Sequence, residues 1–300
     1  MKKVSNKKIV AIVVTYNRCK LLEECIEALL NQLYDGLDVL VVDNNSDDGT
    51  EDFIKKKYKN NKRIIYKNTH ANLGGAGGFN FGMKEAIKLK YNYLWLMDDD
   101  TIVKEDSLIK LLDADMELKG KYGFLSSRAL WTDGNICRMN RQKIYKNSKL
   151  NTDNLSHTYY ATFVSFFIKT DVVKDVGLPI KEFFIWSDDV EYSRRIDQKY
   201  NCFVVEDSKV IHKTKDNKGS NIVYDDARME RYRYAYRNEA YIARHYGFKL
   251  KVRQFLAVNY RLLAVLLLSK KYKIKKAKII IGSSLEGMKF NPKVEFVDED

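Results

Sequence analysis

Three adjacent carboxylates, Asp98, Asp99 and Asp100, directly follow the apolar run Leu94–Met97. Adjacent carboxylates repel one another, and the repulsion is costly unless a positive charge lies close by. Because hard oxygen ligands suit Mg²⁺ or Mn²⁺, the pattern predicts a divalent cation site. In an extended segment Asp98 and Asp100 point to one side and Asp99 points to the other. The alternative is a solvated acidic turn, but the preceding run has the composition of a fully buried strand.

A second acidic cluster, Asp188, Asp189 and Glu191, lies at the start of a predicted helix. Carboxylates at a helix N-terminus interact favourably with the helix dipole, so helix capping is one explanation. The aromatic residues that precede the cluster, Trp186 among them, favour another. They would hold a carboxylate in a partly desolvated pocket, where its pKa and its basicity rise. The cluster is therefore a candidate for a general base.

The segment Asn72–Gly78 contains four glycines in seven residues. Glycine accepts positive φ and allows a ligand to approach the backbone closely. The spacing matches neither the phosphate loop of nucleoside triphosphatases nor the dinucleotide-binding fingerprint. A tight turn between a strand and a helix is the alternative to a ligand-binding loop.

These residues must be positioned by an alternation of strands and helices, which predicts an α/β fold with a mostly parallel sheet flanked by helices. Polar residues follow the first, second and fourth strands, and the glycine segment follows the third. All four clusters should therefore meet at one edge of the sheet, where such folds bind ligands. The predicted strands are Ile9–Thr15, Asp38–Asp43, Arg63–Tyr66 and Tyr93–Met97, and the predicted helices cover about 19–31, 47–58 and 81–90.

The rest of the chain is less regular. A change in character near residue 215 predicts a catalytic domain over 1–215 and a C-terminal helical region over 216–300. The first part continues with strands at Tyr122–Ala129, Tyr159–Lys169, Cys202–Val205 and Lys209–His212 and a helix at Asp188–Tyr200. The second part is expected to hold helices at Tyr224–Tyr246, Lys251–Ser269 and Lys273–Met288.

Composition limits the class of protein. The 300 residues are 45% hydrophobic, which excludes a mainly disordered or fibrous chain, and the net charge of +13 fits partners that carry phosphates. The basic residues are dispersed and no nucleic-acid-binding pattern is recognisable, so nucleic acid is not the expected partner. Four scattered cysteines predict neither disulfides nor zinc. No signal peptide and no apolar run of about 18–20 residues is evident, so a cytoplasmic protein is expected.

The combination of motifs resembles an inverting family 2 glycosyltransferase with a GT-A fold, over about residues 8–215. Within that family it is most similar to the galactofuranosyltransferase and rhamnosyltransferase branch. The motifs are VVTYNR at Val13–Arg18, VVDNNSDDGT at Val41–Thr50, NLGGAGGF at Asn72–Phe79, LMDDD at Leu96–Asp100 and WSDDVEYS at Trp186–Ser193.

The resemblance implies a donor site and a metal site. It implies a Mn²⁺ or Mg²⁺ ion held by Asp98, Asp100 and His212 beside the diphosphate of a nucleotide-sugar donor. Such an ion would stabilise the negative charge that develops on the leaving diphosphate. The residues implied around the donor are Thr15, Asn17, Arg18, Asp43, Asn72, Gly74, Gly75, Gly77, Asp98 and Asp99.

On the acceptor side the resemblance implies that Asp188 is the general base, and that Trp186, Asp189 and Glu191 bind the acceptor. The run Tyr236-Arg237-Asn238 is similar to an element of the family whose Arg237 would touch a phosphate.

The implied reaction is the transfer of a sugar to a hydroxyl of a cell-surface polysaccharide or a glycolipid precursor. The expected donor is UDP-galactofuranose, and dTDP-rhamnose is the alternative. A nucleotidyltransferase would also use carboxylates and a metal, but it would carry a lysine-bearing glycine loop near the first strand, and Val13–Arg18 has none.

The C-terminal region suggests a further partner. The apolar run Phe255–Leu268 is too short to span a bilayer and is interrupted by Arg261. An apolar face beside lysines suits an anionic membrane surface, so peripheral attachment at the inner face of the cell membrane is expected. The alternative is that the leucines pack on the catalytic domain or form an oligomer through a second subunit. The lysines are Lys270, Lys271, Lys273, Lys275, Lys276 and Lys278.

Overall fold

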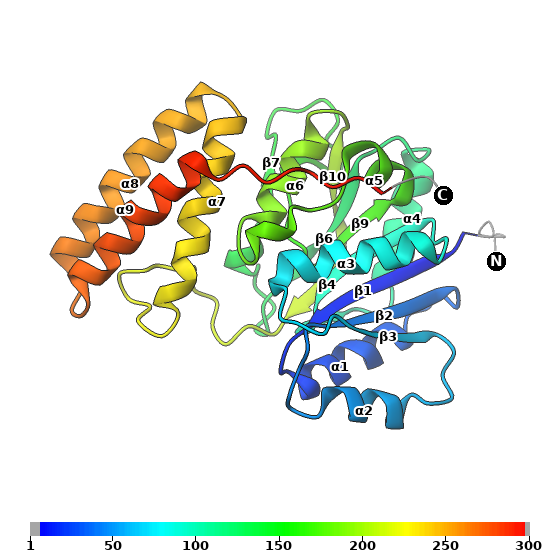
Figure 1. Ribbon diagram of the computed structural model, residues 1–300. Helices are drawn as coiled ribbons and strands as arrows, with labels where there is room; N and C mark the ends of the chain where they lie inside the picture. Colours follow the sequence, from blue (N-terminus) through cyan, green and yellow to red (C-terminus); the bar gives the residue numbers. More distant parts are fainter. Residues whose placement is uncertain (1–6, 298–300) are drawn as a thin grey trace.

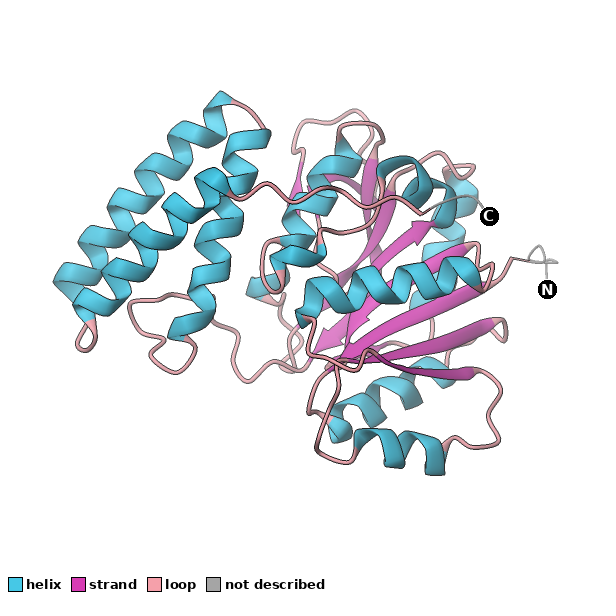
Figure 2. Cartoon of the chain, in the orientation of Figure 1, coloured by secondary structure: helices cyan, strands magenta, loops and turns pink. Residues whose placement is uncertain are grey.

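The computed structural model describes residues 7–297 (Figures 1 and 2). The strands are β1 (Ile9–Thr15), β2 (Leu37–Asp43), β3 (Ile64–Asn68), β4 (Tyr93–Asp98), β5 (Thr101–Val103), β6 (Phe124–Leu130), β7 (Lys143–Ile144), β8 (Leu155–Tyr160), β9 (Phe166–Lys169) and β10 (Cys202–His212). The helices are α1 (Cys19–Leu30), α2 (Thr50–Lys57), α3 (Gly74–Lys88), α4 (Ser107–Glu117), α5 (Thr170–Val176), α6 (Asp188–Asp197), α7 (Tyr232–His245), α8 (Phe248–Leu268) and α9 (Lys273–Lys289).

All the strands belong to one sheet with the order β3-β2-β1-β4-β9-β6-β10-β8-β7, and β5 pairs with β10 outside this path. The first four strands in this order are parallel, as are β6 and β10, while β9 is antiparallel to both β4 and β6. The predicted α/β sheet with flanking helices is confirmed.

Helices cover both faces of the sheet because β1 is apolar on both sides. All seven residues of β1 are buried. Alternate residues point to opposite faces, so Ile9, Ala11 and Val13 pack in a cluster with α1 and α4. Val10, Ile12 and Val14 pack in a second cluster with α3, α5 and α6. A continuous β-branched run of this kind is typical of a strand buried between two layers of helices.

The glycine segment differs from the prediction of a loop. Helix α3 begins at Gly74, seven residues before the predicted start at Phe81. Gly74 has a φ of 70°, which permits the entry into the helix. Two later glycines allow α3 to lie close to the sheet, because a Cβ on Gly78 or Gly82 would lie within 2.6 Å of Val14 or Ile12. Glycine serves helix–sheet packing there, and this overrides its low helix propensity.

Three other boundaries differ. The long predicted helix Tyr224–Tyr246 begins only at Tyr232, and it is preceded by a turn at Asn221, whose side chain accepts the amide of Val223, and by the short 3₁₀ turn Met229–Arg231. The predicted strand Tyr159–Lys169 is divided between the end of β8 and β9. The two predicted strands that end at Val205 and begin at Lys209 form the single strand β10, with a shift of register between these residues.

Helices α7, α8 and α9 pack against one another and lie beside the sheet domain (Figure 1). The segment 290–297 after α9, drawn in red in Figure 1 and called the strap below, then runs back across the sheet domain. There Leu178 donates its amide to the carbonyl of Glu295, and the Glu295 carboxylate pairs with Lys84. The strap thus ties the last described residues to the N-terminal region, while the domain boundary near residue 215 stays a prediction.

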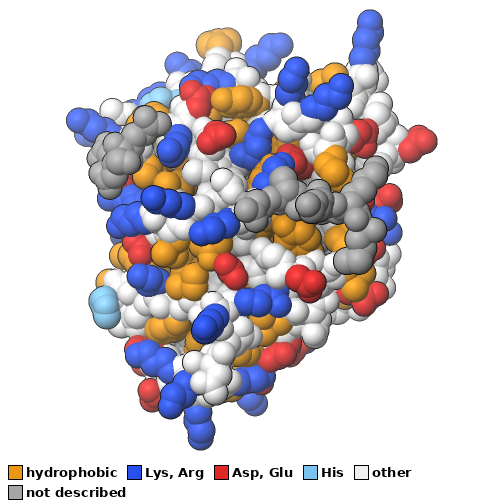
Figure 3. All heavy atoms as spheres, turned by 90° about the vertical axis from the view of Figure 1, so that its right-hand side faces the viewer, with side chains coloured by type: hydrophobic (Ala, Val, Ile, Leu, Met, Phe, Trp, Pro, Cys, Tyr) orange, Lys and Arg blue, Asp and Glu red, His pale blue; other side chains and the backbone are white. Residues whose placement is uncertain are grey.

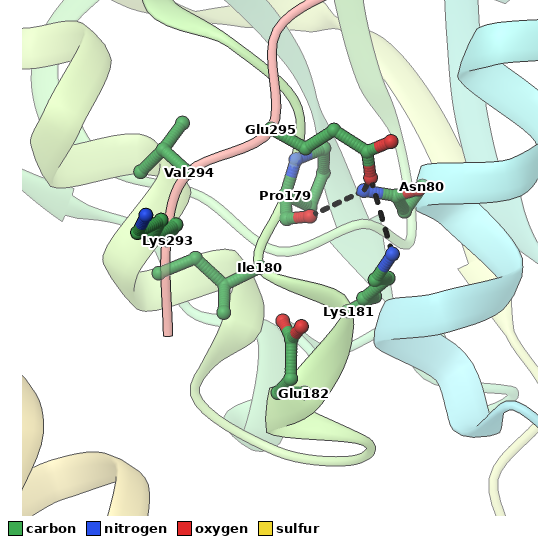
Figure 4. Close-up of a pocket in the computed structure, with 8 residues that line it drawn as sticks. All are labelled: Asn80, Pro179, Ile180, Lys181, Glu182, Lys293, Val294 and Glu295. Carbon is green, nitrogen blue, oxygen red and sulfur yellow. Dashed lines mark hydrogen bonds and ion pairs between the residues drawn. The ribbon is translucent and has the colours of Figure 1, made fainter. Parts of the chain in front are cut away.

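The strap also forms one wall of a shallow pocket (Figure 4). Asn80 on α3 donates to the carbonyl of Pro179 on the opposite wall, and Lys181 pairs with Glu295 at 3.5 Å. On the face of the molecule that lies to the right in Figure 1, basic and acidic side chains are interspersed (Figure 3). Within residues 7–297 no helix is long and apolar enough to cross a membrane.

Candidate functional site

The carboxyl ends of the parallel strands meet, as predicted from the alternation of strands and helices. Thr15 at the end of β1 pairs in register with Asp43 at the end of β2, and Asp43 pairs with Asn68 at the end of β3. On the other side of β1, Val14 pairs with Asp98 at the end of β4. Four strand ends therefore bring their polar side chains to one edge.

His212 comes to the same edge by a different route. The short strand β5 follows the carboxylates and pairs with β10 so that Thr101 lies opposite His212. The Nε2 atom of His212 lies 2.8 Å from Oδ1 of Asp100. The structure therefore joins the first acidic cluster to a histidine 112 residues away in sequence.

Asp98, Asp100 and His212 offer ligand atoms that all lie within 4.8 Å of one another. Two carboxylate oxygens and an imidazole nitrogen suit Mn²⁺ or Mg²⁺. Burial and the nearby charge of Asp100 raise the pKa of Asp98 to about 7. These three residues would hold the ion, and they fit it.

Hydrogen bonds tie the neighbouring groups into one network. Arg18 donates to Asp99 at 3.2 Å and to Asp100 at 2.8 Å, and Thr15 donates to Asp99 at 2.8 Å. Burial opposes the ionised forms throughout, and it raises the pKa of Asp99 to about 6. Although burial acts in the opposite direction, hydrogen bonding to Asp100 raises the pKa of His212 to about 10.

Asn140 orients His212, and nothing in the sequence pointed to it. Its side chain is buried in the short 3₁₀ turn Arg138–Asn140, between β6 and β7. The Asn140 Oδ1 atom lies 2.7 Å from Nδ1 of His212 and 3.0 Å from the sulfur of Cys137, while its amide donates to Thr162 at 3.1 Å. Because Oδ1 can only accept, Nδ1 carries a proton and Nε2 is directed to the carboxylates.

The residues expected around the nucleotide lie together beside Thr15. Asn17 has a φ of 55°, and its side-chain oxygen accepts the amide of Asp47 at 2.9 Å. Asp43 is fully buried and accepts hydrogen bonds of 2.6 Å from both Ser46 and Tyr66. Asp43 therefore fixes the loop after β2, and a ligand would have to share its oxygens with these two partners.

The start of α3 links the donor side to the acceptor side. Asn72 accepts the amide of Gly74 at 3.0 Å, and a Cβ on Gly74 would lie 2.1 Å from the carbonyl oxygen of Phe184. A Cβ on Gly75 would meet no atom within 4 Å, so this backbone is open to a ligand. At Gly77, by contrast, a Cβ would meet the side chain of Leu73 at 2.6 Å. Of the predicted glycines, Gly75 faces free space, and Gly74 and Gly77 serve packing.

The loop before α6 has a strained backbone. Phe184, Trp186 and Ser187 all have φ between 63° and 66°, although none is glycine. Asn238 of α7 is fully buried and donates to the carbonyls of this loop, at 3.0 Å to Phe183, 3.3 Å to Ile185 and 2.8 Å to Trp186. One amide group from the helical region therefore holds the turn that presents the second acidic cluster.

Within that cluster, burial raises the pKa of Asp188 to about 6 and holds the pKa of Asp189 well above its ordinary value. The negative charges of Asp188 and Asp98 also raise the pKa of Asp189. The two acidic clusters therefore lie near enough for the charge of Asp98 to affect the pKa of Asp189. Trp186 is half-buried and packs edge-on against Tyr232 with ring centroids 5.0 Å apart.

Two other residues have different surroundings from those expected. Glu191 is buried and binds Arg195 through both oxygens, at 3.0 and 2.7 Å, and it accepts a hydrogen bond of 2.8 Å from Tyr246. Its oxygens are thus occupied by partners of the fold, which argues against contact with an acceptor. Arg237 donates to the carbonyl of Glu182 at 2.6 Å, so it supports the strained loop where the resemblance implied a phosphate contact.

A sequence profile of Glycosyl transferase family 2 matches residues 10–176, more than half of the chain. Galactofuranosyltransferase GlfT1 of Mycolicibacterium smegmatis is 25% identical over 201 residues, which cover 62% of this chain and 64% of that protein. Glycosyltransferase GlyG of Streptococcus pneumoniae is 29% identical over 131 residues, 42% of this chain and 41% of that protein. The chain thus spans less than two thirds of the length of either relative.

Solved structures share the fold. Mannosyltransferase PcManGT from Pyrobaculum calidifontis, in complex with GDP-Man and Mn²⁺, aligns with a TM-score of 0.60 and 17% identity over 95% of this chain and 76% of that chain. GalNAc-T7 with UDP, GalNAc and Mn²⁺ aligns with a TM-score of 0.60 and 13% identity over 84% of this chain and 55% of that chain. At such low identity the likeness concerns the fold, which is GT-A. With the profile match, it follows that the chain belongs to glycosyl transferase family 2.

Proposed function

We propose that this protein is a metal-dependent inverting glycosyltransferase that moves a sugar from a nucleotide-sugar donor to a hydroxyl group. The observation that carries the proposal is the meeting of Asp98, Asp100 and His212 at the sheet edge, with a second pair of carboxylates, the buried Asp188 and the partly buried Asp189, near enough for the charge of Asp98 to act on Asp189. Family membership supports the reaction type. Structures of the same fold with GDP-Man or UDP and Mn²⁺ support the donor class and the metal.

In this proposal the two acidic clusters have separate tasks. When bound, Mn²⁺ or Mg²⁺ supplies positive charge to the leaving diphosphate. Arg18, half-exposed above Asp99 and Asp100, adds a second cation on the nucleotide side. Gly75 leaves room for the donor to approach the backbone.

The second cluster handles the proton. The acceptor oxygen attacks the anomeric carbon, its proton passes to a carboxylate, and the bond from that carbon to the diphosphate oxygen breaks. A single displacement of this kind inverts the anomeric carbon. Asp188, whose raised pKa increases its basicity, remains the predicted base. Asp189 is the alternative base, because burial and the charges of Asp188 and Asp98 raise its pKa as well.

Matched variants separate the two candidates. Asp188→Asn should lower the transfer rate by about 10²–10⁴-fold while nucleotide binding survives, because only the proton acceptor is lost. Asp189→Asn serves as the matched control, and both are read by release of nucleoside diphosphate and by binding of the free nucleotide. A large loss in Asp189→Asn alone would move the base to Asp189, and near-normal turnover in both would refute the assignment.

The proposed donor is UDP-galactofuranose, and the similarity to a galactofuranosyltransferase supports it. The proposed acceptor is a hydroxyl of a cell-surface polysaccharide or glycolipid precursor, reached at the inner face of the membrane. dTDP-rhamnose is the second candidate, from the resemblance of the glycine and acidic motifs. A donor panel distinguishes them, and turnover only with a pyranose donor such as UDP-glucose would exclude both.

A further inference from the structure

The outermost helix of the C-terminal region, α8, exposes an apolar stripe to solvent. Phe255, Leu256, Tyr260, Leu263 and Leu267 define this stripe, with exposed fractions of 68, 61, 73, 56 and 67%. At 100° per residue they fall within an arc of about 140°, so they form one face about 18 Å long, in which Asn259 is the one polar residue. Single exposed apolar residues are ordinary, but a contiguous face of this kind marks an interaction surface.

The stripe is not broken by charge. Arg261 lies in the middle of α8, yet it turns away from the stripe and binds Glu239 of α7 at 2.5 Å. Its guanidinium also lies 4.9 Å from the ring centre of Tyr236. The residue that interrupts the apolar run in the sequence therefore joins α8 to the rest of the protein.

Positive charge surrounds the stripe. From Phe248 to Leu285 the chain has ten Lys and Arg residues and no Asp or Glu. Three of the ten bind carboxylates of neighbouring segments, and one of these, Lys276, is fully buried against Asp226 at 2.6 Å. Lys276 therefore cannot belong to the surface cluster that the sequence suggested. The cations for which the described residues supply no carboxylate are Lys249, Lys251, Arg253, Lys270, Lys271, Lys273 and Lys278.

We infer that the α8 stripe docks on an anionic lipid membrane, with α8 lying in the plane of the interface. Aromatic and leucine side chains would enter the boundary between headgroups and acyl chains, and the cations at both ends of α8 would meet the headgroups. A second copy of the chain would bring the same unpaired cations against one another, so charge disfavours it. A nucleic-acid surface is polar, and aliphatic leucines do not match it.

Docking through α8 also suits a lipid-linked acceptor. Helix α7 packs against α8 and holds the strained loop before Asp188 through Asn238. The membrane would thus lie beside the region that supports the acceptor side. The docking itself does not depend on the proposed reaction, because it involves neither the carboxylates nor the donor.

Co-sedimentation with vesicles tests the inference on the full chain without nucleotide. The wild type should bind phosphatidylcholine vesicles that contain phosphatidylglycerol, and added salt should weaken this binding. Replacing Lys249, Lys251, Lys270 and Lys271 by Gln should lower the partition coefficient by at least about tenfold. Replacing Phe255, Leu256 and Leu263 by Ser should lower it by a similar factor, because these side chains are exposed and contribute little to the fold.

Matched controls carry the same chemical changes on the catalytic part. They are the Gln variant of Lys59, Lys62, Lys146 and Lys149 and the Ser variant of the exposed Leu33 and Met116. Both should bind like the wild type. Three outcomes would each overturn the inference: no binding to anionic vesicles, equal binding to neutral ones, and a dimer in light scattering that the α8 Ser variant disrupts. Sugar transfer assayed with a water-soluble acceptor should persist in the α8 variants, so failure of docking and failure of the proposed function are distinguishable.

Discussion

At the scale of single residues, the site depends on side chains that hold its acids and its histidine in a defined state. Asn140 fixes the proton on Nδ1 of His212, and Asp100 faces Nε2 of the same ring. Asp100 also accepts from Arg18 at 2.8 Å, so both of its oxygens face positively charged or ligand-type nitrogen groups. Metal affinity should therefore depend on Asn140 although it is not a ligand.

Asn140→Ala should weaken Mn²⁺ binding by about 10–100-fold, because the imidazole loses the partner that orients it. Gln142→Ala is the control, since Gln142 is equally buried nearby but bonds to Ser126 and Ser127. Asn140→Asp keeps an acceptor for Nδ1 and should retain affinity. Calorimetric titration with Mn²⁺ gives the result, and unchanged affinity in Asn140→Ala would contradict the role.

The pH dependence of transfer should report the base. Burial raises the pKa of Asp188 to about 6, and a base accepts a proton only when it is ionised. The rate should therefore be full well above pH 6 and should fall tenfold per pH unit below it. Rates are to be measured at Mn²⁺ concentrations that titration shows to be saturating at each pH. A rate that is flat from pH 7 to pH 5 would exclude Asp188 as the base.

At the scale of elements, the loop that presents Asp188 and Asp189 is held by helix α7 from outside the sheet. Three residues with positive φ form the turn before α6, and only surrounding contacts can maintain such a backbone. Asn238 supplies these contacts with one amide group. The same helix meets α9 closely at Gly287, so α9 in turn packs against the helix that holds the loop.

Asn238→Ala should reduce kcat by about 10–100-fold, because a turn that relaxes by even 1 Å misplaces the carboxylates. The KM for the donor should change little, since the donor residues lie on other elements. Asn259→Ala, on the exposed face of α8, is the control. A lower melting temperature with unchanged kcat would mean that Asn238 has a purely structural role.

Two glycines of α9 give a matched test of the helix packing. A Cβ on Gly287 would lie 2.3 Å from the carbonyl oxygen of Arg237, so Gly287→Ala should lower the free energy of unfolding by about 1–3 kcal/mol. A Cβ on Gly282 would meet nothing within 4 Å, so Gly282→Ala should raise it by up to about 1 kcal/mol. Urea denaturation measures both, and equal effects would contradict the close contact of α7 with α9.

At the scale of the whole molecule, what could be predicted from sequence depended on local pattern. The sheet and its polar edge can be predicted from two short segments, the buried run Ile9–Thr15 and the carboxylates after Leu94–Met97. This is possible because alternation and burial are properties of short segments. Asn140 and Asn238 could not be predicted, since their partners lie 72 and 52–55 residues away. The sequence predicts a loop for the glycine segment, because its use in close packing against Val14 is visible only in three dimensions.

The sequence does not predict the strap over 290–297 or the burial of Lys276, because the contacts that fix them are distant in sequence. A lysine-rich sequence predicts side chains exposed to solvent. Lys276 instead donates to the carbonyl of Val223 at 2.9 Å and to Ser269 at 3.0 Å inside the helical region. The chain thus behaves as one connected molecule. Its last described segment contacts helix α3, and its helical region holds the loop before the second acidic cluster.

The most direct test of the central claim is nucleotide release by the purified protein with a panel of nucleotide sugars and a hydroxyl acceptor. The account predicts that free nucleoside diphosphate and the transferred sugar appear in equal amounts. It also predicts that chelator abolishes both, that Mn²⁺ restores both, and that Asp98→Asn and Asp100→Asn remain inactive. Release of pyrophosphate, or full transfer in a metal-free preparation, would contradict it.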